Sequence, residues 1–188
     1  CIRDSFYTYL KPGLTYGQPC LVVAPPDGVP PLDYLAQSPW MALAQKHDLF
    51  LHMLVPREGG WDLTGEDADY MNRVYVQINS RSSYVVIQDN IYAVGVGRGA
   101  TVAQQAVMKM SSEWSGLATF GDLEQDVLIH AQETAPAVNT GRTELVIAAT
   151  KAPVPVWMSW TESTGANAQV RSYWQQLNDS DPEPYANR

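Results

Sequence analysis

A short apolar run that leads directly into a cluster of glycines is the feature of this sequence that most constrains its fold. Residues 91–94 read Ile-Tyr-Ala-Val, residues 95–99 read Gly-Val-Gly-Arg-Gly, and residues 100–110 are rich in helix formers without Gly or Pro. Glycine is expected where a strand turns sharply into a helix, because it tolerates positive φ and lets two backbones approach closely. The pattern therefore predicts a strand–turn–helix unit.

The rest of the chain alternates between apolar runs and helical patterns. Short apolar runs without a helical period predict strands, whereas apolar residues at intervals of three and four predict helices. Strands are expected at residues 6–10, 20–24, 49–55, 91–94, 116–121, 145–149 and 153–160, and helices at 40–48, 67–80, 100–110 and 165–177. This order predicts an α/β fold with a mostly parallel sheet and helices on both faces. We expect one domain over residues 1–177 and a polar tail at 178–188.

Charge and composition disfavour several classes of function. The chain has 188 residues and a net charge of −8, and an acidic surface repels phosphate backbones, so nucleic acid is not expected as a partner. No apolar stretch approaches the roughly 20 residues of a transmembrane helix, so no membrane-spanning segment is predicted. The three histidines and two cysteines lack the spacing of a metal site, and neither a metal nor a cofactor is predicted.

Two phosphate-binding motifs can be compared with the glycine cluster. The dinucleotide-binding pattern G-x-G-x-x-G matches if Ala100 replaces the last glycine, which is a permitted variant. The acidic ribose partner should lie about 20 residues further on, where Glu113 and Asp122 are approximate candidates. A P-loop is excluded, because no Gly-Lys-Ser/Thr follows. A dinucleotide-binding domain that uses residues 95–99 therefore stays open as an alternative.

The cluster also matches the nucleophile elbow G-x-S-x-G, with Gly97 at the position of the serine. Residues 88–100 resemble the D-x-x-R-I-Y-V-T-G-x-S-x-G-G segment of α/β-hydrolases like polyhydroxybutyrate depolymerases and feruloyl esterases. Residues 20–28 resemble the strand and oxyanion loop of that family, where it has L-V-V-x-L-H-G. Residues 153–158 are similar to the later strand that leads to the catalytic acid, and residues 170–178 to a helix with a Tyr-Trp motif.

These segments span most of the chain and follow one another in the order that the family has. The resemblance implies a three-layer α/β-hydrolase fold, activity on carboxylic esters, and a secreted or extracytoplasmic location. It also implies an active site at the carboxyl ends of the strands. Gly97 would take the nucleophile position without a nucleophilic atom, and the N–H of Arg98 with the loop residues Pro26, Asp27 and Gly28 would form the oxyanion hole.

The acid and the base of a catalytic triad are less well matched. Glu162 is the acidic residue nearest to the end of the strand at 153–160, and is the acid candidate. In the family the histidine follows the acid along the chain. No histidine follows Glu162, and His130 is the only histidine after the glycine cluster, so it is the remaining base candidate. A triad in the family's order is therefore incomplete within these 188 residues.

Two interpretations follow from the missing nucleophile. The first is a pseudo-hydrolase, which keeps the scaffold for binding or assembly without catalysis. The second is a serine esterase whose serine is replaced at Gly97, or a piece of a longer or cleaved chain that ends before the last strand and the catalytic histidine. In either case Trp61 and Trp160 are candidates to line a cleft for an ester or a carbohydrate-linked ligand, because exposed aromatic side chains stack on sugars and aryl groups.

The two cysteines leave one more alternative open. Cys1 would be a nucleophile if its own free amine acted as the base. Cys1 and Cys20 could instead form a disulfide, which would agree with an extracytoplasmic location, or remain two reduced thiols.

Overall fold

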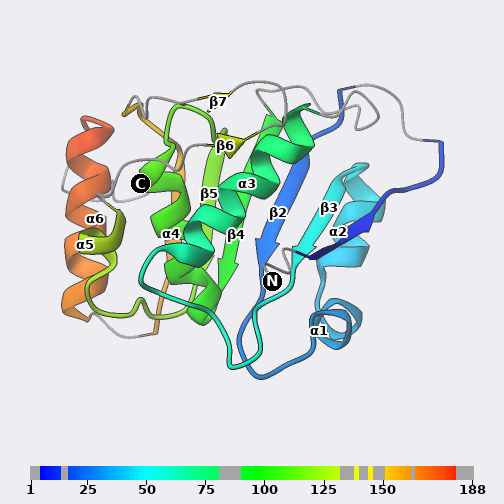
Figure 1. Ribbon diagram of the computed structural model, residues 1–188, viewed down its shortest axis with the longest axis horizontal. Helices are drawn as coiled ribbons and strands as arrows, with labels where there is room; N and C mark the ends of the chain where they lie inside the picture. The colour runs from blue at the N-terminus through cyan, green and yellow to red at the C-terminus, as the bar shows by residue number, and fades with distance from the viewer. Residues whose placement is uncertain are drawn as a thin grey trace, which may run out of the picture.

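The computed structural model describes residues 5–13, 17–80, 90–131, 138–139, 144–145, 151–161 and 164–180. One sheet has six strands in the order β1-β3-β2-β4-β5-β8, and β6 and β7 form a separate pair (Figure 1). β1 runs antiparallel to β3, and the other neighbouring strands of the large sheet are parallel. The elements in chain order are β1 (Phe6–Tyr9), β2 (Cys20–Ala24), α1 (Pro31–Gln37), α2 (Trp40–His47), β3 (Phe50–Leu54), α3 (Glu66–Ser80), β4 (Ile91–Val96), α4 (Arg98–Lys109), β5 (Gly116–Phe120), α5 (Val127–Ala131), β6 (Val138–Asn139), β7 (Glu144–Leu145), β8 (Val156–Ser159) and α6 (Gly165–Leu177).

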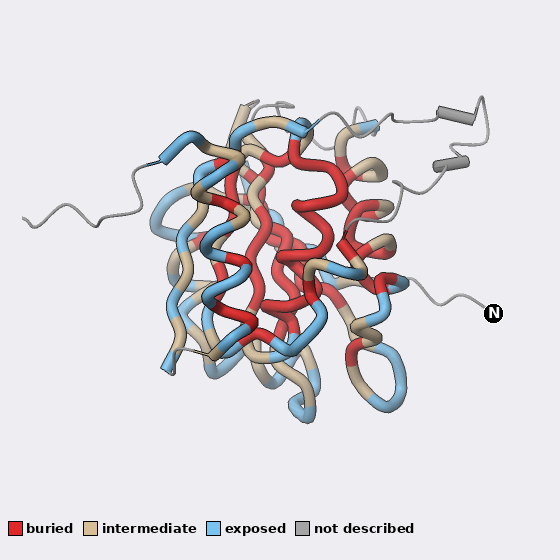
Figure 2. The backbone as a smooth tube through the Cα atoms, turned by 90° about the vertical axis from the view of Figure 1, so that its left-hand side faces the viewer, coloured by how far each residue is buried: buried red, intermediate tan, exposed pale blue. Residues whose placement is uncertain are grey.

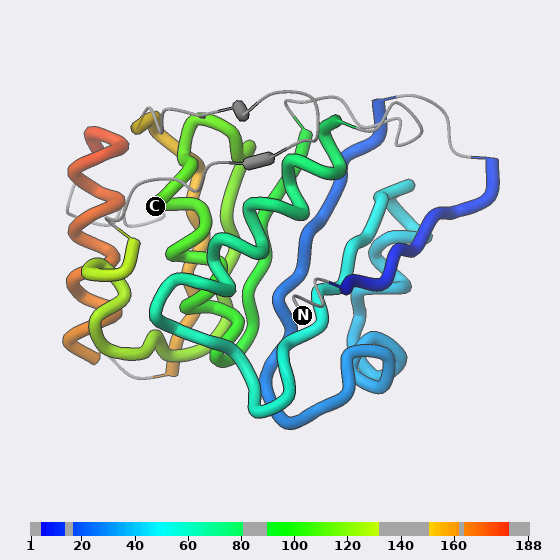
Figure 3. The backbone as a smooth tube through the Cα atoms, viewed as in Figure 1, coloured from blue at the N-terminus to red at the C-terminus, as the bar shows by residue number. Residues whose placement is uncertain are grey.

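Helices cover both faces of the sheet, which gives the molecule three layers. Neighbouring residues of a strand point to opposite faces. In β2, Val22 belongs to the larger core with α3 and α4, whereas Val23 belongs to a smaller core with α2. α3 and α4 lie across the centre of the sheet, and α6 lies at the β8 end, opposite β1 (Figures 1 and 3). The prediction of a mostly parallel sheet with helices on both faces is confirmed.

Burial explains why the central strands appear in the sequence as uninterrupted apolar runs. Every residue of β3 is buried, and in β2 only Leu21 is partly exposed. A strand that is covered on both faces has no solvent side, so its sequence does not alternate. In Figure 2 the buried segments lie in the interior of the molecule, and the exposed positions lie on loops and on the outer sides of helices.

Most predicted elements are observed, and the differences have local causes. α2, α3, α4 and α6 each begin and end within two residues of a predicted helix. β8 is shorter than the strand predicted at 153–160, because Pro153 and Pro155 cannot donate to a strand ladder. α1 has no counterpart among the predicted helices. It begins at Pro31, a position where proline's missing N–H costs no helical hydrogen bond.

Two of the predicted segments fall partly outside the described residues. β7 (Glu144–Leu145) contains only Leu145 of the strand predicted at 145–149, and residues 146–149 are not described. α6 ends at Leu177, the chain is described as far as Ser180, and 181–188 are not. Within the described ranges, no helix is long and apolar enough to cross a membrane.

Candidate functional site

The turn between β4 and α4 has the sharp geometry that the glycine cluster predicts. Gly97 has φ 57° and ψ −129°, in a positive-φ region that side chains disfavour. Its N–H donates to the carbonyl oxygen of Phe120 at 2.8 Å, and its own carbonyl accepts from the N–H of Ala100 at 2.9 Å. The first hydrogen bond joins the turn to the end of β5, and the second is the first hydrogen bond of α4.

The two flanking glycines are required by contacts between backbones. A Cβ on Gly95 would lie 2.4 Å from the carbonyl oxygen of Gly99, and a Cβ on Gly99 would lie 2.3 Å from the carbonyl oxygen of Ala24. Neither distance leaves room for a side chain. β4, α4 and the end of β2 therefore meet through backbone atoms, and the predicted strand–turn–helix unit is confirmed.

Residue 97 is enclosed on two sides. A Cβ on Gly97 would lie 3.2 Å from the Cβ of Pro26, which is a tight contact that a small shift can relieve. On the other side Gly121, with φ 119°, lies so close that its own Cβ would be 3.2 Å from both Cα and N of Gly97. Gly97 thus presents backbone and no nucleophilic atom at the carboxyl edge of the sheet.

An ion pair lies next to this turn. Arg98 Nη1 is 3.1 Å from Asp27 Oδ2, and Arg98 Nε is 3.5 Å from Glu124 Oε1. The other oxygen of Asp27 accepts the backbone N–H of Trp61 at 3.1 Å. The guanidinium of Arg98 is shared between two carboxylates, so it is not an unpaired cation at the turn.

The loop after β2 limits which backbone groups can serve an oxyanion. Pro26 was a candidate for the oxyanion hole, and this is wrong on chemical grounds, because proline has no backbone N–H. Pro25 lacks one for the same reason. Asp27 and Gly28, which has φ 78°, follow in this loop, and the N–H of Arg98 opens α4. The first residue of this loop with a backbone N–H to donate is therefore Asp27.

The structure does not bring the candidate base to the turn. His130 lies in α5, and its carbonyl oxygen is 3.6 Å from where a Cβ of Gly65 would be. The same position is 2.9 Å from Nζ of Lys109, a residue in the last turn of α4, whereas Gly97 precedes the first turn. No described contact joins His130 to Gly97, which corrects the role proposed for it. The acid candidate, Glu162, lies outside the described residues.

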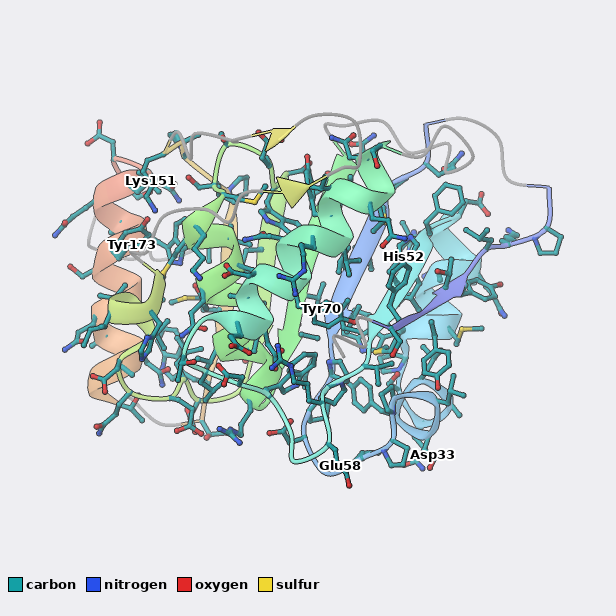
Figure 4. The ribbon with its side chains drawn as sticks, in the orientation of Figure 1. Asp33, His52, Glu58, Tyr70, Lys151 and Tyr173 are labelled. Carbon is teal, nitrogen blue, oxygen red and sulfur yellow. The ribbon has the colours of Figure 1, made fainter. Side chains whose placement is uncertain are left out.

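His52 and Cys20 are core residues. His52 is fully buried in β3, Thr8 Oγ1 is 3.0 Å from its Nδ1, and burial lowers its pKa to about 4 (Figure 4). Cys20 is a buried free thiol whose pKa is raised by burial. A free thiol at Cys20 contradicts the possible disulfide with Cys1, and the candidate N-terminal nucleophile Cys1 lies outside the described part of the chain.

The two tryptophan candidates have different environments. Trp61 is only 3% exposed, and its Nε1 donates to the carbonyl oxygen of Pro25 at 2.7 Å, so it belongs to the core and cannot stack on a ligand. That corrects its proposed role in a cleft. Trp160 is partly exposed and lines an open groove of about 260 Å³ between β8 and α6.

Asp122 lies at the carboxyl edge of the sheet and is not among the residues predicted for a hydrolase-like site. It follows Gly121 at the end of β5, and its carboxylate accepts hydrogen bonds from Thr161 Oγ1 at 2.6 Å and from Asn167 Nδ2 at 3.3 Å. It therefore holds the segment that follows β8 against the end of β5. The available signal was its position, since an acidic residue directly after a parallel strand lies at the carboxyl edge.

Among the side chains that the structure describes, no group of three or more His, Cys, Asp or Glu could hold a metal ion. No protein-family model matches the sequence, and no curated protein matches it.

The fold is nevertheless shared with solved esterases. A carboxylesterase from Bacillus cereus is 14% identical with a TM-score of 0.59, and the match covers 94% of this chain and 81% of that one. Esterase 2 of Thermogutta terrifontis is 12% identical with a TM-score of 0.55, over 93% of this chain and 72% of that one. An acetyl xylan esterase from Aspergillus awamori is 15% identical with a TM-score of 0.54, over 62% of this chain and only 46% of that one. At such low identities the likeness concerns the fold alone, which is a three-layer α/β-hydrolase-like fold.

Proposed function

We propose that this domain is an α/β-hydrolase scaffold that serves in binding or assembly and does not cleave esters at the Gly97 turn. The observation that carries the proposal is the turn itself. It combines the positive φ of Gly97 with close backbone contacts at Gly95 and Gly99, but it presents no nucleophilic atom.

Acyl transfer needs a nucleophile, a base within hydrogen-bond reach, and donors aimed at the developing oxyanion. Residue 97 supplies no nucleophile, and His130 makes no described contact with it. Two consecutive prolines after β2 remove two backbone donors from the loop that faces the turn. Each of these features weakens hydrolysis, and together they support a non-catalytic role.

A serine esterase with its serine replaced is the second candidate. It is favoured by the space at position 97, where the described atoms within 4 Å of an added Cβ are the Cβ of Pro26 at 3.2 Å and its Cα at 3.6 Å. The dinucleotide alternative has less support, because the N–H of Gly97 already donates to Phe120 and is not available to a pyrophosphate. An ester or a carbohydrate-linked compound remains the ligand class that we propose for the scaffold.

Ester hydrolysis by three proteins separates the first two candidates. The unchanged chain, Gly97→Ser and the matched variant Gly97→Ala would be incubated with p-nitrophenyl acetate and butyrate, with circular dichroism as the check on folding. We expect the background rate from all three. Hydrolysis by Gly97→Ser and not by Gly97→Ala would overturn the non-catalytic proposal in favour of the esterase.

A further inference from the structure

A groove runs along the outer side of β8, away from the Gly97 turn. It has a volume of about 260 Å³ and opens to solvent between this strand and α6. β8 is the last strand of the large sheet, so no further strand within the described residues covers its outer edge. The residues that line the groove are Val156, Met158, Trp160, Arg171, Trp174, Gln175, Asn178 and Ser180.

The floor of the groove is apolar and firmly held. Val156, Met158 and Trp160 alternate along the chain, so they point to the same side of the strand. Trp174 is 3% exposed, and its Nε1 donates to Gln104 Oε1 at 2.7 Å, which fixes the indole ring. Side chains that are already fixed lose little conformational entropy when a ligand binds.

The wall at the far end is also fixed. The side chain of Asn178 accepts from the N–H of Val154 at 2.9 Å through Oδ1 and donates to its carbonyl oxygen at 2.7 Å through Nδ2. Both ends of this amide are thus used in joining the end of α6 to the segment before β8. The groove is therefore a preformed feature of the packing between strand and helix.

Arg171 is the one charged side chain among the described residues that line the groove. Arg171 is exposed, and no acidic side chain in the described part of the chain pairs with it. Arg57 and Arg98, in contrast, are each paired with two carboxylates. No Asp or Glu is among the described residues that line the groove, although the whole chain carries a net charge of −8. Among its described lining residues the groove thus offers one exposed guanidinium, that of Arg171, without a carboxylate partner.

We propose that this groove binds a small carboxylate with an aryl body. The carboxylate pairs with the guanidinium of Arg171, whose planar fork matches the two oxygens. The aryl ring lies over Met158 and Trp160, where it buries apolar surface. The volume of about 260 Å³ suits a ligand of one ring and a short chain.

This site is separate from the Gly97 turn and does not rest on the proposed function. Gly121, which touches Gly97, donates its N–H to the carbonyl oxygen of Ser159 at 2.8 Å, at the end of β8. The groove begins on the next residue, Trp160, and is built from β8 and α6 rather than from β4 and α4. A variant that disrupts the groove should therefore leave β4 and α4 intact, and a variant that disrupts the turn should leave β8 and α6 intact.

The test uses 3-phenylpropanoate and its neutral analogue 3-phenylpropanamide. Binding would be followed by isothermal titration calorimetry and by the indole N–H signals in ¹H–¹⁵N spectra of the full chain. We expect a saturable shift of the Trp160 signal with the carboxylate, and affinity for the amide lower by about tenfold or more, because the charge-assisted pair is lost.

Matched variants assign the two parts of the groove. Arg171→Gln should weaken carboxylate binding by about tenfold or more, whereas Lys46→Gln, which removes one exposed positive charge on α2, should not. Trp160→Ala should weaken binding of both compounds, whereas Trp157→Ala should not, since Trp157 is 66% exposed on the neighbouring, opposite-facing position of β8. The proposal is overturned if the unchanged chain does not bind the carboxylate, if the amide binds equally well, or if Arg171→Gln binds as the unchanged chain does.

Discussion

Gly121 lies directly against Gly97, so that a Cβ on Gly121 would be 3.2 Å from both the Cα and the N of Gly97. The N–H of Gly97 also donates to the carbonyl oxygen of Phe120, the residue before Gly121, at 2.8 Å. The turn after β4 and the end of β5 therefore support each other through backbone atoms, and the shape of the turn depends on a residue outside the G-x-G-x-G motif.

Replacing Gly121 with alanine should destabilise the protein. Its φ of 119° disfavours a side chain, and the added Cβ would press on the turn at Gly97. We expect the free energy of unfolding to fall by about 1–3 kcal/mol in urea denaturation. Gly165→Ala is the control, because a Cβ there meets nothing within 4 Å, and it should change stability by less than about 0.5 kcal/mol. Equal effects of the two variants would contradict the account of the turn.

The two members of the Asp27–Arg98 pair should contribute unequally to stability. Asp27→Ala breaks the ion pair and also leaves the N–H of the buried Trp61 without its acceptor, at a cost of about 1–2 kcal/mol. Arg98→Gln breaks only exposed ion pairs, because 44% of its side chain is in solvent, and should cost less than about 1 kcal/mol. Urea denaturation of both variants measures the difference, and a larger loss for Arg98→Gln would show that the ion pair is the main contribution.

Burial of His52 should make the protein less stable as the pH falls. Its pKa is lowered from 6.5 to about 4, so above pH 6.5 the folded and unfolded forms are both neutral at this residue. Between pH 6.5 and about 4 the unfolded form takes up a proton that the folded form does not, which removes about 3 kcal/mol of stability. The difference in unfolding free energy between the unchanged chain and His52→Gln should shrink across this range.

The parts of the fold that the sequence predicts correctly are those set by neighbouring residues. The strand–turn–helix unit is local, because residues 91–110 contain the apolar run, the glycines and the helix formers. The buried strands β2 and β3 are apolar at nearly every position, and four helices have a clear apolar period. These patterns are enough to predict the sheet and its two helical layers.

Long-range pairs account for what the sequence did not predict. Asp27 and Arg98 are 71 residues apart, and no local pattern links them. Trp61 lies in a Gly-rich loop, which suggests exposure, yet its indole is held in the core by a bond to Pro25 across 36 residues. Chain order makes His130 the base candidate, since it is the only histidine after the glycines, whereas its position depends on how α5 packs on α4.

Intact-protein mass spectrometry after treatment with a fluorophosphonate probe tests most directly whether the Gly97 turn is non-catalytic. The probe becomes bonded to a serine only if that serine is activated as a nucleophile by a neighbouring base. We predict that neither the unchanged chain nor Gly97→Ser gains the mass of the probe, while circular dichroism shows both to be folded. A stoichiometric gain in mass by Gly97→Ser, absent in Gly97→Ala, would show that a working base faces the turn and would contradict the proposal that this hydrolase fold is non-catalytic.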